Sequence, residues 1–365
     1  MNKAAFIVID SGFSRGSMLG ASRVLGIRDL GEGRTVCGAP FVDAEELNRL
    51  AIDPVRHGSI VLERLRALDP DAPLVLIKAY GADLTLARTT WQGGRQVAEG
   101  WVEAYLWAVE LCQKAGLPSV ANGSFGGFTH GMDGTGWESF QLGRATGSGR
   151  SGHVLVAAAG PGDGRAVHAS WLTEAGSATT LEVYQQESAS YNLWAGAPGV
   201  HGWQLEVWQG GNLLRTFDGT AIAVNFWNNR QQLTFTLEGT GEFHFRLVRG
   251  GDTVSSAAPE LRFDCWVVRG GGAFFLNHVD PTLVSEPAIF PQVLSAGLRN
   301  GCYSPAQCLP GGKPDILLEG GGPISFRLPE VTAAVGRLLT ANPSLDVDGV
   351  RSLIGKYPGV PGLRA

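Results

Sequence analysis

Three short runs of almost purely apolar residues constrain most strongly what this chain can fold into. They are Ala4–Ile9, Leu74–Ala79 and Val154–Ala159. Such runs are typical of strands buried on both faces, as in a parallel sheet covered by helices. Apolar residues at helical spacing over Gln96–Ala115 and Pro329–Thr340 supply helices of the kind required. We therefore predict an α/β fold with a mostly parallel sheet and helices on both faces.

The central part of the chain has a different pattern, with short β-prone segments separated by Gly-, Asp- and Asn-rich turns. This spacing favours an antiparallel β-sandwich. The expected strands are Leu181–Tyr184, Gln204–Trp208, Ala221–Phe226, Gln232–Leu237, Phe243–Leu247 and Phe263–Val268. We predict a sandwich at 172–278, inserted between the two parts of the α/β domain at 1–171 and 279–365.

Composition and charge exclude some classes of function. The formal net charge of −5 argues against a nucleic-acid or anionic-membrane partner. No apolar run reaches the ~20 residues that span a bilayer, and no signal-peptide pattern is present. The five cysteines are odd in number and scattered, so Cys302 and Cys308 are expected to be reduced thiols, although a disulfide or a metal site is open to them. We expect a cytoplasmic protein without a cofactor or metal.

Three separated residues together indicate a serine-nucleophile site. Asp10 ends a buried strand at a tight turn, His57 precedes an apolar helix-like run, and Ser325 opens an amphipathic helix. A serine hydroxyl needs a base within hydrogen-bond reach, and that base needs an acid to fix its tautomer. The chain order Asp, His, Ser is one of those known for such triads.

The segments around these residues extend the pattern over nearly the whole chain. They are Val8-Ile9-Asp10-Ser11-Gly12, His57-Gly58-Ser59-Ile60-Val61, Gly123-Ser124-Phe125-Gly126-Gly127, Val156-Ala157-Ala158-Ala159-Gly160, Lys313-Pro314-Asp315-Ile316 and Ser325-Phe326-Arg327-Leu328-Pro329. Together they resemble the subtilisin-like serine peptidases, the subtilase family. His130-Gly131-Met132-Asp133-Gly134-Thr135 and the segment 165–170 are similar to the clostridial Csp-type branch, which carries an inserted jelly-roll sandwich.

The resemblance implies that Asp10, His57 and Ser325 are the catalytic residues. It implies substrate-binding roles for five residues in two strand segments of the sheet, Gly123–Gly127 and Val156–Gly160. These are Ser124, Phe125, Gly126, Ala158 and Gly160.

One position departs from the family at the oxyanion hole. The family's asparagine donor is replaced by Pro161, which has neither a side-chain donor nor a backbone N–H. Loss of one such donor costs about 10²–10³ in turnover, a figure that comes from subtilisin itself. Asn122 and Ser124 are candidate replacement donors. The residues before the nucleophile, Pro323-Ile324, also differ from the family's Gly-Thr.

The expected function is a selective serine endopeptidase that acts on a peptide or protein, such as a leader peptide or one specific partner. The alternatives are a catalytically impaired pseudopeptidase that binds a peptide or partner and, third, a peptide ligase or macrocyclase. Few residues precede Asp10, so no inhibitory pro-domain is expected. The oligomeric state is left open.

Overall fold

The computed structural model describes residues 3–14, 17, 23–37, 52–81, 86–88, 90–92, 95–128, 134–160, 166–198, 202–219, 221–225, 227–250, 260–269, 272–280, 283–298, 312–320 and 322–355. The chain forms two compact units. The first contains Met1–Gly126, Trp137–Gly162 and Pro287–Ala365, and the second contains Gly127–Gly136 and Asp163–Glu286. None of the described helices is long and apolar enough to cross a bilayer.

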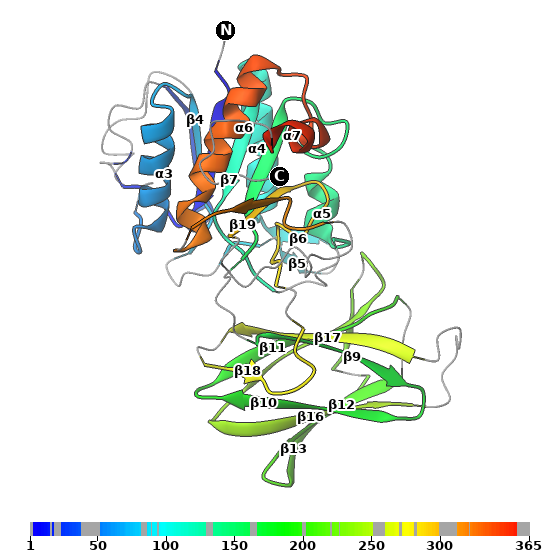
Figure 1. Ribbon diagram of the computed structural model, residues 1–365. Coiled ribbons are helices and arrows are strands. Elements are labelled where there is room, and N and C mark those ends of the chain that lie inside the picture. The colour runs from blue at the N-terminus through cyan, green and yellow to red at the C-terminus, as the bar shows by residue number, and fades with distance from the viewer. Residues whose placement is uncertain are drawn as a thin grey trace. The chain divides into compact units, whose positions relative to one another are not determined.

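An eight-stranded sheet forms the centre of the first unit (Figure 1). In spatial order its strands are β20 (Ile316–Leu318), β19 (Leu294–Leu298), β8 (His153–Ala158), β7 (Ser119–Gly123), β1 (Ala5–Asp10), β4 (Leu74–Lys78), β2 (Val24–Asp29) and β3 (Arg34–Cys37). All neighbours pair in parallel except β2 and β3. The predicted α/β fold class with a mostly parallel sheet is therefore confirmed.

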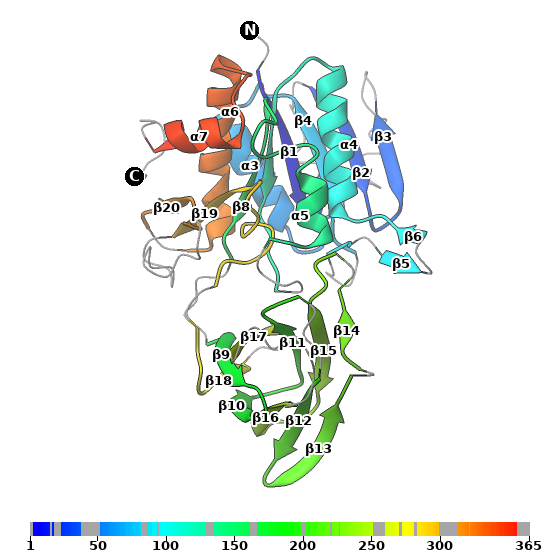
Figure 2. The same ribbon diagram turned by 90° about the vertical axis from the view of Figure 1, so that its right-hand side faces the viewer.

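Helices cover both faces of this sheet (Figure 2). They are α3 (His57–Leu68), α4 (Trp101–Lys114), α5 (Trp137–Leu142), α6 (Leu328–Ala341) and α7 (Val347–Ile354). Helices α3 and α6 lie on one face, where Phe6 and Val8 of β1 join their apolar core, and α4 lies on the other. Because β1 is covered from both sides, all its residues are buried, which explains its uninterrupted apolar sequence.

Helix α4 begins later than its apolar spacing predicts. The expected helix started at Gln96, but Arg95–Ala98 forms β6, which pairs with β5 (Thr90–Gln92) as a hairpin. Gly100 then begins the helix, and the Glu103 carboxylate accepts a hydrogen bond from the Gly100 N–H. This capping interaction sets the start of α4, because it satisfies the Gly100 N–H, which has no partner within the helix.

The second unit is an antiparallel β-sandwich. One sheet has the order β13 (Asn212–Phe217), β12 (Trp203–Gln209), β16 (Gly241–Arg249), β10 (Ala178–Gln185) and β18 (Phe274–Phe275). The other has the order β14 (Ala223–Val224), β15 (Gln231–Leu237), β11 (Ala189–Ala195), β17 (Glu260–Arg269) and β9 (His168–Glu174). Side chains of large aromatic residues, including Tyr191 and Phe245, fill the space between them. The predicted inserted sandwich is confirmed.

The sandwich pairs its own entering and leaving segments. Ala169 at the start of β9 forms an antiparallel bridge with Val279. On either side, the Ser170 N–H donates to the His278 carbonyl and the Asp280 N–H donates to the His168 carbonyl, both at 3.0 Å. The two ends of the insert are therefore joined by backbone hydrogen bonds within this unit.

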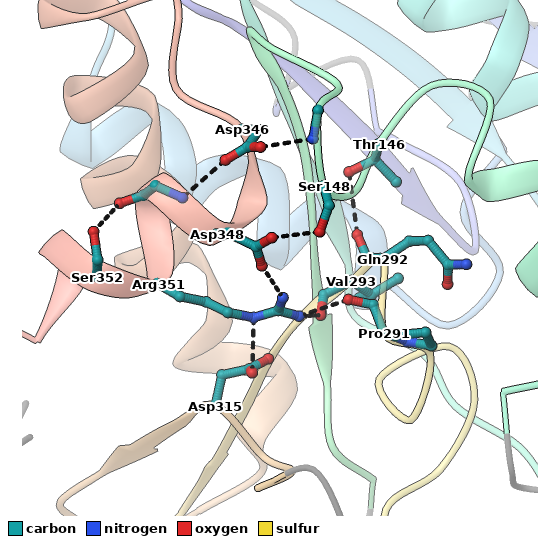
Figure 3. A network of polar contacts seen from close by, with 12 residues as sticks. Thr146, Ser148, Pro291, Gln292, Val293, Asp315, Asp346, Asp348, Arg351 and Ser352 are labelled. Carbon is teal, nitrogen blue, oxygen red and sulfur yellow. Dashed lines mark hydrogen bonds and ion pairs between the residues drawn. The ribbon is translucent and has the colours of Figure 1, made fainter.

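A polar network fixes the last helix of the first unit to the amino-terminal ends of the sheet strands (Figure 3). Arg351 of α7 donates to Asp315 before β20 at 3.0 Å and to Asp348 at 2.7 Å. It also donates to the carbonyls of Pro291 and Val293, which precede β19. One guanidinium thus joins three segments that are far apart in sequence, which its planar array of donors makes possible.

We expect Arg351→Ala to lower the free energy of unfolding by about 2–3 kcal/mol, because it removes charge-assisted hydrogen bonds to Asp315 and to two carbonyls at once. Chemical denaturation monitored by circular dichroism measures the change. Ser352→Ala on the exposed side of the same helix is the control and is expected to cost less than about 0.5 kcal/mol. Equal stability of Arg351→Ala and the wild type would contradict this role.

Candidate active site

Asp10 ends β1 at the carboxyl-terminal edge of the sheet and is buried. Its Oδ1 accepts hydrogen bonds from the Ser11 N–H and from His57 Nδ1, both at 2.7 Å. Its buried Oδ2 has no hydrogen-bond partner among the residues that the structure describes. Burial raises the pKa of Asp10, and the hydrogen bond and charge of His57 oppose that shift. The position matches the general rule that sites in parallel sheets lie at the carboxyl ends of the strands.

His57 is the first residue of α3 and keeps 29% of its side chain exposed. A carboxylate only accepts hydrogen bonds, so the contact with Asp10 assigns the proton to Nδ1 and leaves Nε2 free to act as a base. Burial alone lowers the pKa of His57. The hydrogen bond and charge of Asp10, with a contribution from Asp53, outweigh burial and raise the pKa above its usual value.

Asp53 and Ser11 tie the first turn of α3 to the end of β1. The Asp53 carboxylate accepts from the Ser59 N–H at 2.8 Å, from the Ser59 hydroxyl at 2.6 Å and from the Ser11 hydroxyl at 2.8 Å. Ser11 Oγ in turn accepts from the Gly58 N–H at 3.2 Å. Sequence reasoning missed both residues, although an aspartate followed by proline just before a helix is a recognisable start signal.

Glycine is required where this turn meets the strand. A Cβ on Gly58 would lie 2.2 Å from the Gly12 carbonyl oxygen and 2.8 Å from Asp10 Cβ. Gly12 itself has φ of 140°, and a Cβ there would lie 2.4 Å from the Ile52 carbonyl oxygen. The Asp10–His57 contact therefore depends on a backbone approach that no other residue type permits.

We predict that Gly58→Ala separates α3 from β1, lowers the free energy of unfolding by about 2–4 kcal/mol and removes the Asp10–His57 hydrogen bond. Thermal unfolding measures the stability, and the downfield Nδ1 proton in an NMR spectrum reports the hydrogen bond. Gly219→Ala is the matched control, because a Cβ there meets nothing within 4 Å. Persistence of the downfield proton in Gly58→Ala would contradict the prediction.

Ser325 lies in a 3₁₀ turn, η2 (Ile324–Phe326), immediately before α6. Its hydroxyl donates to the Ser124 carbonyl at 3.3 Å, and Ser124 Oγ lies 3.1 Å from the Ser325 carbonyl. Ser124 directly follows β7, so the nucleophile turn is held at the same edge of the sheet as Asp10.

The structure brings the predicted triad into one region but leaves the serine hydroxyl turned aside. The ring of Phe326, next to Ser325, lies 5.3 Å from the His57 ring. Among the hydrogen bonds of the described residues, none joins Ser325 Oγ to His57, since the hydroxyl faces Ser124. In this arrangement the hydroxyl is paired with the Ser124 carbonyl and not with the base.

The two candidate replacement donors for the oxyanion are already engaged. Asn122 is completely buried, and its side-chain amide donates to Thr332 Oγ1 at 2.9 Å. Ser124 Oγ lies 2.7 Å from Asn122 Oδ1. These hydrogen bonds hold the end of β7 against α6 and the Ser325 turn, which argues against a role of either side chain as oxyanion donor. Pro161 lies outside the described residues.

The predicted substrate-binding residues lie at the ends of β7 and β8 but differ in exposure. Phe125 is buried, with its ring edge-on to Trp101 at 5.1 Å, whereas Gly126 is exposed. Ala158 is buried at the end of β8, and Gly160 has a φ of 114° that favours glycine. Phe125 is thus part of the hydrophobic core at this edge.

Among the described residues, one group in the sandwich has the chemistry of a metal site: His168, Asp264 and Asp280. Arg262, however, donates to Asp264 at 2.9 Å and also lies 3.3 Å from Asp280. Burial raises the pKa of Asp264, but hydrogen bonds from His168 and Arg262 outweigh it and lower the pKa to about 2. The group is an ion-pair cluster that already contains its own cation. Cys302 and Cys308 lie outside the described residues.

Comparison with solved structures identifies the fold. The CspB protease of Clostridium perfringens matches with a TM-score of 0.70 and 16% identity, over 99% of this chain and 90% of that chain. Fervidolysin from Fervidobacterium pennivorans, a keratinolytic enzyme related to subtilisin, matches at 12% identity over 100% of this chain and 42% of that chain. Its TM-score is 0.36, so no conclusion about the fold is drawn from this match. No protein-family model and no curated protein matches the sequence. The chain has the fold of a clostridial subtilisin-like protease, as the sequence resemblance implied.

We predict that the raised pKa of His57 appears as a titration midpoint above 6.5, measured by NMR of the imidazole in Ser325→Ala. Because folding favours the protonated form, the associated stabilisation is present below the ordinary pKa and is lost as pH rises through the folded pKa. Asp10→Asn removes the opposing charge, leaves burial dominant and should move the midpoint below 6.5. A midpoint at or below 6.5 with Asp10 intact would be evidence against this electrostatic coupling.

Proposed function

We propose that the protein is a serine endopeptidase of the subtilisin type. The observation that carries the proposal is the 2.7 Å hydrogen bond from His57 Nδ1 to buried Asp10, with Ser325 on the adjacent turn. An aspartate that fixes the tautomer leaves His57 Nε2 available to take the proton of a serine hydroxyl. The subtilisin-like fold supports the same reading.

In the proposed reaction, the Ser325 hydroxyl turns from the Ser124 carbonyl toward His57 Nε2. As Ser325 Oγ bonds to the substrate carbonyl carbon, His57 accepts the hydroxyl proton and becomes an imidazolium, which the Asp10 carboxylate stabilises. His57 then gives this proton to the leaving amine as the peptide bond breaks. Water then attacks the acyl carbon while His57 Nε2 accepts its proton, and His57 returns that proton to Ser325 Oγ as the ester bond breaks and the carboxylic acid leaves. The substrate is a peptide or protein, and the altered oxyanion position favours a selective role over general digestion.

A pseudopeptidase that binds a peptide or partner without cutting it is the second candidate. Two observations favour it. Ser325 Oγ is hydrogen-bonded away from its base, and Pro161 replaces the expected oxyanion donor. Either feature slows acylation, and together they suffice to stop it if the serine rotamer does not change. Peptide ligation or macrocyclisation uses the same acyl-enzyme chemistry with an amine in place of water.

A fluorophosphonate probe tests the first function against the second, because it reacts with a serine that a neighbouring base activates. We expect wild type to be labelled between pH 6 and 9, and Ser325→Ala and His57→Ala to be labelled at least about 100-fold more slowly. Mass spectrometry of the labelled peptide should place the adduct on Ser325. The absence of labelling at every pH would favour the pseudopeptidase.

A further inference from the structure

Helix α3 presents two side chains toward the nucleophile turn, and they lie seven residues apart. His57 and Arg64 share a face of α3 because seven residues make almost two full helical turns. Phe326 contacts both of them. Its ring centroid is 5.3 Å from that of His57, and the Arg64 guanidinium carbon lies 5.3 Å from the same ring centroid.

Arg64 also holds the backbone of the turn. Its Nη1 donates to the Phe326 carbonyl at 2.6 Å. Among the described residues this is the hydrogen bond that joins α3 to η2. Cation–π contact and a charge-assisted hydrogen bond therefore act on one residue, the immediate neighbour of Ser325.

The rest of the turn is tied to other elements. On its inner side Ser325 contacts Ser124, which belongs to the β7 end. On its far side Arg327 binds Glu330 of α6 and the carbonyl of Glu319. None of these contacts joins the turn to α3, where the base lies. The apolar core that α3 shares with Ile324 and α6 sets the overall spacing, and the contacts of Phe326 fix the turn locally beside His57.

We propose that Arg64 is a positioning residue for the nucleophile, acting through Phe326, and this inference rests on the proposed peptidase function. Arg64 holds the Phe326 carbonyl and ring against α3. It thereby fixes the position of Ser325 Oγ relative to His57 Nε2 when the serine side chain turns toward the base. Because attack requires reacting atoms held within a fraction of an ångström, loosening this turn lowers the rate of the chemical step more than it weakens binding. Arg64 is exposed, so its removal leaves the core intact.

The test compares Arg64→Leu, Arg64→Lys and Glu63→Ala, the last being an exposed neighbour on the same helix. An alkyl fluorophosphonate probe gives the maximal inactivation rate and the probe's inhibition constant separately. We expect Arg64→Leu to lower the maximal rate about 10-fold with the inhibition constant within about twofold, and melting temperature within about 2 °C. Arg64→Lys should recover part of the rate, since lysine keeps the positive charge and can still donate to the Phe326 carbonyl, but lacks the planar guanidinium. Glu63→Ala should behave as wild type.

A second measurement does not depend on activity. In a Ser325→Ala background, the imidazole proton shifts of His57 report the ring current of Phe326. Arg64→Leu should move these shifts in the same direction as Phe326→Leu, and Glu63→Ala should not move them. Wild-type labelling rates in Arg64→Leu, an equal loss in Glu63→Ala, or unmoved His57 shifts would each overturn the role of Arg64. If wild type itself is not labelled, the peptidase proposal fails, and the His57 shifts alone decide whether Arg64 positions the turn.

Discussion

The arrangement of this site depends on one close approach, where the first turn of α3 passes over the end of β1. Gly58 faces the Gly12 carbonyl and Asp10 with no room for a side chain. A buried carboxylate is costly unless donors reach it. The Ser11 N–H is a local donor, and the approach of α3 supplies the second donor, His57 Nδ1. The hydrogen bonds of Asp53 to Ser59 and Ser11 hold the approach in place. Close backbone packing, the Asp10–His57 electrostatics and these hydrogen bonds therefore depend on one another.

Much of this could be predicted from sequence because its causes are local. A strand buried on both faces has an uninterrupted apolar sequence, so β1, β4 and β8 were recognisable, and the triad candidates lay in short motifs. Strands β11 and β13 were missed because neither alternates: β11 is almost wholly buried and β13 almost wholly exposed. The contacts of Phe326 with Arg64, and of Asn122 with Thr332, join residues more than two hundred positions apart. Nothing in the local pattern of either segment specifies such pairs.

The two edges of the central sheet have different tasks. Asp10, Ser124 and the turn of Ser325 lie at the carboxyl ends of the strands. The network of Arg351 lies at the opposite edge, where it joins segments that precede β19 and β20 (Figure 3). Helix α6 connects the two, since it begins next to Ser325 and its end leads into α7. Substitutions in the candidate active site at the carboxyl ends of the strands therefore need not disturb the Arg351 network at the amino ends.

The paired ends of the sandwich have a consequence for how the chain folds. Strands β8 and β19 are neighbours in the sheet, yet the whole of Asp163–Glu286 is synthesised between them. If that segment were an unstructured loop, joining β19 to β8 would carry the closure entropy of a long chain. The bridge between Ala169 and Val279 removes part of that cost, because a folded sandwich holds its own ends together. The folded insert then counts as a shorter connection, and pairing of β19 with β8 requires the closure of fewer free residues.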